Sequence, residues 1–352
     1  MSKMLDEIRQ QPEALERTLR SGLRAARRFR KRLAGRRPRL IILTARGTSD
    51  NAAHFGRYLL EITTGIPVSL SAPSVFTMYG ATVDLKDTLV VAVSQSGEST
   101  DINLVLERAA EHDAFTAGIT NESGSTLAHL THELFLVRAG KERSVAATKT
   151  YTGQLLMFYL LAYALGAPID LEDLHRIPDW AAAALNVEPQ VREVVNRYRF
   201  MTDTVVVGRG LNYASALEFA LKLKETCYVV AEGFSAADFL HGPIAMVEES
   251  FPVMLFGAGG PTWPSMRQMI EKLHAQKAET LVITDKGNRE APSLSRTISL
   301  PLKFSSPTTQ PSDLYTPIPY ILPAQTFAAV LAEEKGHNPD RPRALSKVTL
   351  TM

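Results

Sequence analysis

One pattern of short apolar runs occurs twice in this chain of 352 residues. The segment 40–47 is an apolar run that ends in glycine ahead of a helix-like stretch, and the segment 204–210 repeats this arrangement. Three further runs follow in each half, at 89–93, 115–120 and 133–137 and again at 252–256, 280–284 and 297–301. Runs that arose by chance would not keep this spacing. The chain is therefore predicted to contain two copies of one architecture.

Each run is short, rich in β-branched residues and free of apolar–polar alternation, which is typical of a strand buried on both faces of a parallel sheet. Helical stretches such as Asn51–Thr63 and Ser99–Glu111 separate the runs. The predicted fold class is α/β, with two tandem three-layer α/β/α domains, each built on a parallel, flavodoxin-like sheet. Ligands of such sheets bind beyond the carboxyl ends of the strands.

The predicted organisation has five parts. A helical segment (1–35) precedes the first domain (36–170), a proline-containing linker (171–194) leads to the second domain (195–335), and a tail (336–352) follows. A helix is expected over Ala324–Lys335, and Pro339 and Pro342 rule out its continuation into the tail. The apolar run Leu155–Leu165 is too short to cross a bilayer and is interpreted as a buried helix.

Charge and cysteine content limit the classes of function. The net charge of +2 gives no general reason to expect nucleic acid, although the stretch 17–39 is rich in arginine. That stretch fits a nucleic-acid patch or a solvated helix with a basic C-terminal end, and the lack of accompanying aromatic residues favours the second interpretation. A single cysteine, Cys227, excludes an internal disulfide framework and suits a reducing cytoplasm. We therefore expect a cytoplasmic protein that binds neither nucleic acid nor membrane.

A hydroxyl-rich turn follows the run 89–93. Ser94-Gln95-Ser96-Gly97-Glu98-Ser99-Thr100 precedes a predicted helix, so glycine would allow close backbone approach and the helix N-terminus would offer free N–H groups to an anion. An ordinary serine-rich N-cap is the alternative. The turn Gly47-Thr48-Ser49-Asp50 supplies further hydroxyls at an equivalent strand end, and two such ends in one domain favour a phosphate site.

Segment Ser94–Ser99 resembles the phosphate-binding motif of SIS (sugar isomerase) domains, and the resemblance to the isomerase half of glucosamine-6-phosphate synthases extends over essentially the whole chain. The matching segments are Glu7-Ile8, Gln11-Pro12, Gly47–Ser49, Ala147–Lys149, Ala216–Glu218, Leu221–Glu225, Ala231-Glu232, His241–Pro243 and Pro342–Lys347. The resemblance implies a sugar phosphate held by Thr48, Ser49, Ser94, Gln95, Ser96, Ser99, Val145, Lys222 and Ser346. Ala147 departs from the pattern, because the family usually has a serine there that helps to bind sugar hydroxyls.

Three residues are candidates for the chemistry. Glu225 lies on a helix expected over Tyr213–Val230, one turn after Lys222, and a carboxylate could carry a proton between two sugar carbons. By itself this pattern more often describes a solvated Glu–Lys pair, and a lone histidine such as His241 is more often structural. The resemblance assigns Glu225 as the base, His241 as the ring-opening group, contributed to the neighbouring subunit of a homodimer, and Lys347 to the open-chain sugar near its carbonyl.

The reaction is interpreted from what the chain contains. The synthases take ammonia from a glutaminase domain with an N-terminal cysteine, which this sequence lacks, so glutaminase activity is not expected. The sequences of segments 45–50 and 146–149 resemble those of stand-alone SIS deaminases. This resemblance implies that the protein converts glucosamine 6-phosphate to fructose 6-phosphate and ammonia. A fructosamine-phosphate deglycase, a synthase-like aldose–ketose isomerase and a non-catalytic sugar-phosphate sensor remain alternatives. The histidines are scattered without ligand spacing, so no metal and no cofactor is expected.

Overall fold

The computed structural model describes residues 2–33, 35–304, 311–345 and 347. It divides into two compact units. The first-sheet unit contains Glu13–Glu142 and Lys149–Arg176 together with Leu345 and Lys347, and the second-sheet unit contains the described residues of Met1–Pro12, Arg143–Thr148 and Ile177–Ala344. Each unit is described by itself below.

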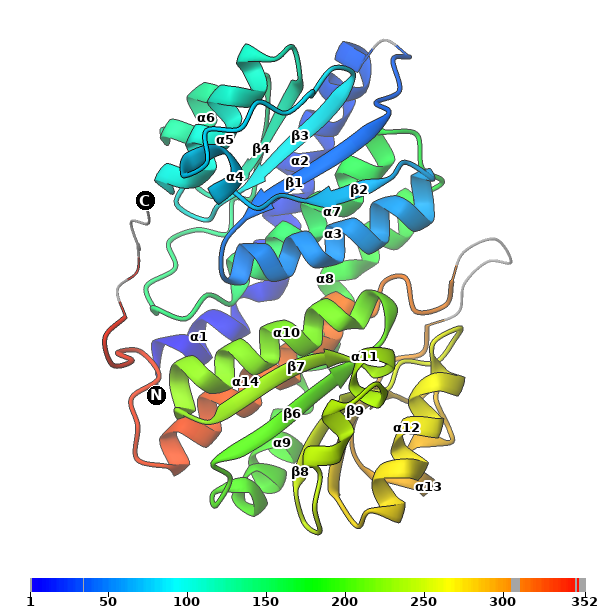
Figure 1. Ribbon diagram of the computed structural model, residues 1–352. Coiled ribbons are helices and arrows are strands. Elements are labelled where there is room, and N and C mark those ends of the chain that lie inside the picture. The colour runs from blue at the N-terminus through cyan, green and yellow to red at the C-terminus, as the bar shows by residue number, and fades with distance from the viewer. Residues whose placement is uncertain (1, 34, 305–310, 346, 348–352) are drawn as a thin grey trace. The chain divides into compact units, whose positions relative to one another are not determined.

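The first sheet has five parallel strands in the order β2-β1-β3-β4-β5. Their bounds are β1 (Leu40–Ala45), β2 (Val68–Leu70), β3 (Thr88–Val93), β4 (Phe115–Thr120) and β5 (Glu133–Leu136) (Figure 1). Ala45 is paired with Val93, and Val93 with Ile119, so β1, β3 and β4 end side by side at one edge. The turns that follow β1, β3 and β4 therefore lie close together at this edge of the sheet.

Helices cover both faces of this sheet. They are α2 (Gln11–Leu33), α3 (Thr48–Thr64), α4 (Ser74–Thr77), α5 (Thr100–Glu111), α6 (Thr126–Leu130) and α7 (Lys149–Ala164). A further helix, α8 (Leu171–Leu185), has its first six residues in this unit and the rest in the second-sheet unit. Val90 and Ala92 of β3 pack in one core cluster with residues of α5 and α6. Phe29 of α2 contacts Phe115 and Phe135 edge to face, with ring centroids 5.5 and 5.7 Å apart.

The second sheet repeats the first, with the order β10-β9-β8-β6-β7 and all strands parallel. Its strands are β6 (Asp203–Gly208), β7 (Val230–Ser235), β8 (Pro252–Phe256), β9 (Glu279–Asp285) and β10 (Arg296–Leu300). Its unit also contains α1 (Lys3–Arg9), α9 (Glu188–Val195), α10 (Tyr213–Lys222), α11 (Ala236–Leu240), α12 (Trp263–Ala275), α13 (Ala291–Leu294) and α14 (Pro317–Glu334).

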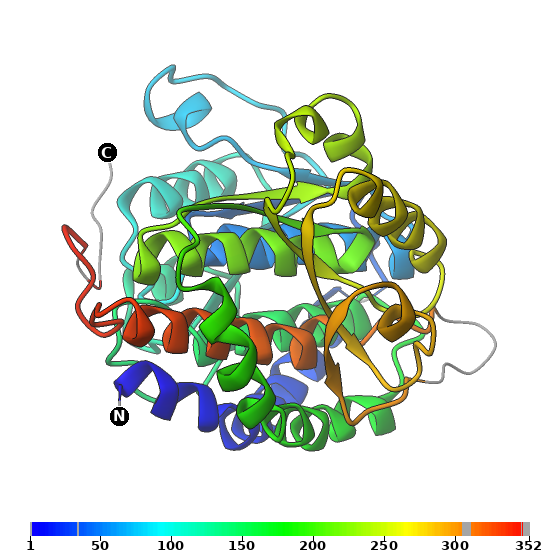
Figure 2. The ribbon, with the colours of Figure 1, turned by 90° about the horizontal axis from the view of Figure 1, so that it is seen from below.

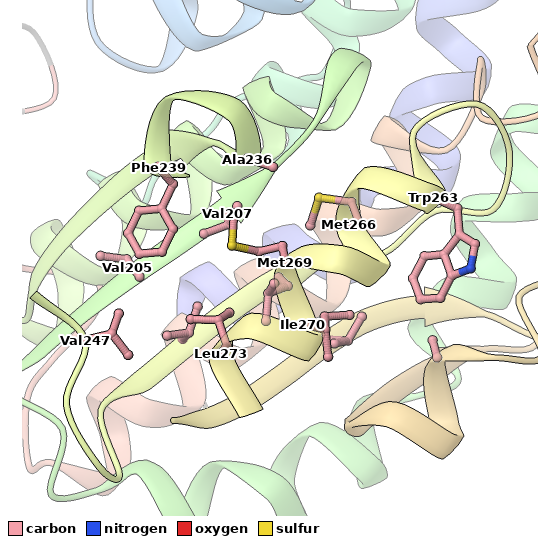
Figure 3. Packing of buried hydrophobic residues seen from close by; sticks show 14 residues of the cluster. Val205, Val207, Ala236, Phe239, Val247, Trp263, Met266, Met269, Ile270 and Leu273 are labelled. Atoms are coloured by element: carbon pink, nitrogen blue, oxygen red, sulfur yellow. The ribbon is translucent and has the colours of Figure 1, made fainter. Parts of the chain in front are cut away.

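The two faces of the second sheet have different partners. Val205 and Val207 of β6 pack against Met266, Ile270 and the rest of an apolar cluster on α11, α12 and α13 (Figure 3). On the opposite face, Phe219 of α10 contacts Phe256 of β8 and Phe327 of α14. The sheet is thus the middle of three layers, with α12 and α13 on one side and α10 and α14 on the other (Figures 1 and 2).

The architecture confirms the predicted fold class, and all eight apolar runs are strands of two parallel sheets. Sequence reasoning missed one strand in each sheet, β2 and β7, which both lie at a sheet edge. Edge strands are partly exposed and need not be apolar: β7 contains Glu232 and Gly233. The segment predicted as a linker is largely helical, in α8 and α9, and the C-terminal helix begins at Pro317, before the expected Ala324.

The helix expected over Tyr213–Val230 is wrong in its second half. Regular α-helix ends at Lys222, a π-helical turn follows over Leu223–Cys227, and Tyr228 then takes a left-handed conformation with φ 56°. Val230 already belongs to β7. In the part of the chain that the structure describes, we find no helix long and apolar enough to span a membrane.

Candidate functional site

The serine-rich turn lies where the sequence predicts, between the end of β3 and the start of α5. The Ser94 hydroxyl accepts a hydrogen bond from the Gly97 N–H at 3.1 Å, which folds the turn back on itself. The Gln95 carbonyl accepts from the Asn121 N–H at 3.2 Å, just beyond β4. Gly97 has φ +69°, a conformation that a side chain disfavours. The turn is therefore fixed to the ends of two neighbouring strands.

Two serines of this turn differ in their contacts. The half-buried Ser96 hydroxyl accepts from the Glu98 N–H at 3.3 Å. Ser99 is the residue that precedes α5, but its hydroxyl donates to Asp101 Oδ1 at 2.9 Å and does not cap the helix. An ordinary N-cap therefore does not describe Ser99. The Ile102 N–H in the first turn of α5 donates to Asp101 Oδ1 at 2.9 Å, so an anion at this turn would be bound by the N–H groups that precede Ile102.

Asp101 adds a charge that the sequence analysis did not consider. Its carboxylate is 3% exposed and lies in the first turn of α5. The helix dipole stabilises a negative charge there, but this charge would repel a phosphate. Arg46, which follows β1, donates from Nε to Asp101 Oδ2 at 2.7 Å. The guanidinium offsets the carboxylate and places a positive charge beside the turn.

A hollow of about 520 Å³ opens next to the turn. Its lining consists of Gln95, Ser96, Glu98, Glu122, Gly124, Ser125, Lys141, Glu142 and Lys347. Lys347, in the C-terminal tail, thus lines the same hollow as Ser96, although the two residues are far apart in the sequence. Its ammonium lies 3.4 Å from the carboxylate of Glu142. Ser346, the other predicted tail residue, lies outside the described residues.

The second hydroxyl-rich turn is arranged differently. Thr48 is the first residue of α3 and is half-buried. The Ser49 side chain is buried, and its hydroxyl accepts from Gln154 Nε2 of α7 at 2.9 Å. Neither residue lines the hollow of the cradle. Both remain predicted sugar contacts.

The second-sheet unit holds a buried charged group on α10 and the π-helical turn. The ammonium of Lys222, which is fully buried, lies 2.5 Å from Glu225 Oε2 and 3.3 Å from Glu218 Oε1. Burial by itself lowers the pKa of Lys222, but Glu218 first and then Glu225 outweigh it, so this pKa is raised above its ordinary value. Lys222 therefore stays charged and orients the partly exposed carboxylate of Glu225.

The π-helical turn has a direct consequence for the site. It adds one residue to the turn that carries Glu225, and such insertions in helices occur frequently at functional sites. Cys227 lies in the same turn, buried, with its thiol donating to the Ala328 carbonyl. Burial raises the pKa of Cys227 to about 12, so its thiol is protonated at neutral pH and is no nucleophile.

His241 and Val145 complete the predicted residues of this unit. His241 is exposed at the C-terminal end of α11, and Gly242, with φ +150°, turns the chain directly after it. Val145 is half-buried in the segment Arg143–Thr148. The buried Glu7 carboxylate holds this segment by accepting from the backbone N–H groups of Arg143 at 2.5 Å and Ser144 at 3.1 Å.

Sequence reasoning missed four charged residues at these places. Glu218 lies four residues before Lys222 on one helix, and this i,i+4 spacing could have revealed it. Arg46, Asp101 and Glu142 gave no such signal, because their partners come from other segments of the chain.

Comparisons with known proteins agree with this architecture. The family model described as "SIS domain" matches residues 36–164 and 203–305. An isomerizing glutamine–fructose-6-phosphate aminotransferase of Arabidopsis thaliana is 34% identical over 99% of this chain. The chain spans only 54% of that relative's length.

Two solved structures are similar along nearly the whole chain. A candidate phosphosugar isomerase of Silicibacter pomeroyi has 31% identity and a TM-score of 0.84, covering 97% of this chain and 100% of its own. The C-terminal domain of the glucosamine–fructose-6-phosphate aminotransferase of Francisella tularensis has 26% identity and a TM-score of 0.85, covering 97% of this chain and 98% of its own.

Proposed function

This chain belongs to the SIS domain family, and from that premise we propose that it is an amino-sugar phosphate deaminase of the isomerising kind. Its substrate is glucosamine 6-phosphate, and its products are fructose 6-phosphate and ammonia. The observation that carries the proposal is the hollow of the first-sheet unit, in which Gln95 and Ser96 lie together with the ammonium of Lys347. A site for a sugar phosphate needs donors for the phosphate and a reactive group at the other end of the sugar.

The cradle binds the phosphate through neutral donors. The hydroxyls of Ser94 and Ser96, the Gln95 amide and the first N–H groups of α5 surround the anion. The Ser99 hydroxyl, which donates to Asp101 in the ligand-free protein, joins them by turning from that carboxylate to the phosphate. Hydrogen bonds from such donors to a charged group are each worth about 1.5–3 kcal/mol. Arg46 is already paired with Asp101, so the phosphate meets little excess positive charge and can leave after the reaction.

In this proposal the proton transfers are carried out by the residues that the family resemblance assigns to them. His241 takes the proton of the sugar O1 hydroxyl and returns a proton to O5, which opens the ring. The Glu225 carboxylate removes the proton from C2 and delivers it to C1, while O1 gains a proton and the amino nitrogen loses one. The aldose with an amino group at C2 thereby becomes a ketimine with a hydroxyl at C1. Lys222, bound to Glu225 and Glu218, orients the base during this step.

Hydrolysis completes the reaction. Water adds to C2 of the ketimine, the C2–N bond breaks, and ammonia leaves as the C2 carbonyl of fructose 6-phosphate forms. Lys347 lies near the reacting carbons and binds the carbonyl end of the open chain. Ammonia is present mostly as ammonium at neutral pH and is then no nucleophile, so release of ammonia is the favoured direction.

The active assembly in this proposal is a homodimer in which His241 serves the site of the partner subunit. Its exposure at the end of α11 is compatible with this role, because a residue that acts on another subunit must lie at the surface. An isologous dimer would then contain two identical shared sites.

The test is ammonia release from a panel of hexosamine 6-phosphates that vary at C4 and in N-acetylation, with glutamine as a further candidate donor. We expect release from glucosamine 6-phosphate without added metal or nucleotide, and none from glutamine. Lys347→Ala is the matched negative control, since it leaves the serine cradle intact. A protein that interconverts sugar phosphates without releasing ammonia from any member of the panel would be an aldose–ketose isomerase, and one that only binds them would be a sensor.

A further inference from the structure

Glu142 is a buried carboxylate at the hollow of the cradle, and neither the sequence motifs nor the proton-transfer steps account for it. Its side chain is 0% exposed. The Thr150 hydroxyl donates to its Oε2 at 2.5 Å, the Thr150 N–H lies 3.4 Å from its Oε1, and the Lys347 ammonium lies 3.4 Å from its Oε2. All three residues belong to the first-sheet unit.

The location of this carboxylate explains how it is held. Thr150 is the second residue of α7, so Glu142 lies at the N-terminal end of a 16-residue helix, where free N–H groups and the helix dipole favour a negative charge. The bond from the Thr150 hydroxyl fixes the orientation of the carboxylate. The contacts with Thr150 therefore hold the Glu142 carboxylate in place independently of Lys347.

Lys347 has the opposite character. It is carried by the C-terminal tail, its side chain is 27% exposed, and its four-carbon stem has many rotamers. A cation that approaches a buried carboxylate is attracted to it, because the carboxylate has lost much of its hydration. The 3.4 Å contact between the fixed carboxylate and the ammonium therefore favours a position of the lysine at the hollow.

The other carboxylates that line the hollow are arranged differently. Glu98 is exposed, and its carboxylate accepts from the Thr126 N–H and hydroxyl at 3.0 and 2.8 Å. Glu122 is also exposed. Of these three lining carboxylates, Glu142 is the buried one, and it is the one paired with Lys347.

We propose that Glu142 is a positioning residue that holds Lys347 over the phosphate cradle, ready for the carbonyl end of the substrate. The contribution to turnover rests on the proposed function, whereas the hold on Lys347 exists in the ligand-free protein. Loss of the Glu142 charge should therefore free the lysine whether or not the protein deaminates a sugar.

Trace acylation of the full, ligand-free chain tests the hold directly. Acetic anhydride at limiting concentration labels accessible, unpaired lysines, and mass spectrometry gives the rate at each site. In the wild type, Lys347 should label more slowly than Lys141, an exposed lysine of the same hollow. Glu142→Gln, which keeps the shape and the acceptor for Thr150, should raise the rate at Lys347 several-fold and leave Lys141 unchanged. The fully buried Lys222, which lies in the other unit, should stay protected and so report an intact fold.

Two variants guard against a merely structural effect. Glu142→Asp retains the charge but withdraws it by one methylene, so it should also speed labelling of Lys347 and is the fallback if Glu142→Gln does not fold. Glu133→Gln removes another buried, ion-paired carboxylate of the same unit, 2.9 Å from Arg28, and should leave labelling of Lys347 unchanged. An unchanged rate at Lys347 in both Glu142 variants would overturn the proposal.

Kinetics then test the consequence for the reaction. Glu142→Gln should lower kcat for ammonia release on the order of 10²-fold, the loss expected when a reacting group is misplaced by about 1 Å, with little change in KM. Adding Glu142→Gln to Lys347→Ala should cause no further loss, whereas additive losses would show that Glu142 acts independently of Lys347. Faster labelling of Lys347 in a protein that releases no ammonia would refute the proposed function and support the hold.

Discussion

Replacing Gly97 with alanine tests how tightly the phosphate cradle is built. A Cβ atom on Gly97 would lie 2.2 Å from Ser125 Oγ and 2.5 Å from Ser125 Cβ. Non-bonded carbon atoms prefer separations of about 3.5–4.0 Å, so either the turn or the start of α6 must move. The backbone at Gly97 is also left-handed, with φ +69°.

These two effects set the expected magnitude. A left-handed conformation costs an L-residue about 1–2 kcal/mol, and overpacking of a filled site costs about 1–3 kcal/mol. Gly97→Ala should therefore lower the free energy of unfolding by about 2–5 kcal/mol, which urea denaturation would measure. Calorimetry should show weaker binding of glucosamine 6-phosphate as well, because the displaced turn carries Ser96.

A second variant separates the two contributions. Ser125→Gly removes both of the nearest atoms and by itself costs only a few tenths of a kcal/mol, since glycine is tolerated at the N-cap of α6. The double variant should recover the overpacking share and keep a loss of about 1–2 kcal/mol from the backbone. The reasoning would be refuted by a Gly97→Ala variant that binds normally and has a free energy of unfolding within about 0.5 kcal/mol of the wild-type value.

Three further predictions address individual groups. Ser96→Ala should weaken sugar-phosphate binding by about 1.5–3 kcal/mol in calorimetry, because the anion loses one donor, and unchanged affinity would remove Ser96 from the site. Glu225→Gln keeps the shape of the base but cannot accept the proton from C2, so binding should survive while turnover collapses, and near-normal kcat would exclude Glu225 as the base. Mixing inactive His241→Ala and Glu225→Gln chains in equal amounts should restore roughly a quarter of wild-type activity, because about half of the dimers are mixed and each has one intact site. If proven subunit exchange restores nothing, His241 does not serve a partner subunit.

The repeat of apolar runs was sufficient to predict both parallel sheets, because central strands buried on two faces must be apolar. All four edge strands pair with one neighbour and can carry polar residues. The edge strands β5 and β10 were still recognised by their apolar residues, whereas β2 has only three residues and β7 contains Glu232 and Gly233, so neither was predicted. The π-helical turn after Lys222 was not predicted, because Leu223, Lys224 and Glu225 favour an ordinary helix. In the folded chain the turn contacts a distant segment, since the Cys227 thiol donates to the Ala328 carbonyl, 101 residues away.

The candidate site divides in the same way. The cradle was predictable because Ser94–Thr100 is a local motif that follows a recognisable strand. The pairs Arg46–Asp101 and Glu142–Lys347 were not, because their members are 55 and 205 residues apart and no periodicity connects them. Charged pairs between distant segments emerge only from the folded chain.

The balance of products from glucosamine 6-phosphate tests the central claim most directly. Nuclear magnetic resonance can follow the sugar phosphate while an enzymatic assay follows ammonia in the same sample, with Glu225→Gln as the matched control. The account predicts that the wild type forms fructose 6-phosphate and ammonia in equal amounts, that neither appears with Glu225→Gln, and that glutamine adds nothing. A new sugar phosphate that forms without an equal amount of ammonia would contradict the account and identify the protein as an isomerase.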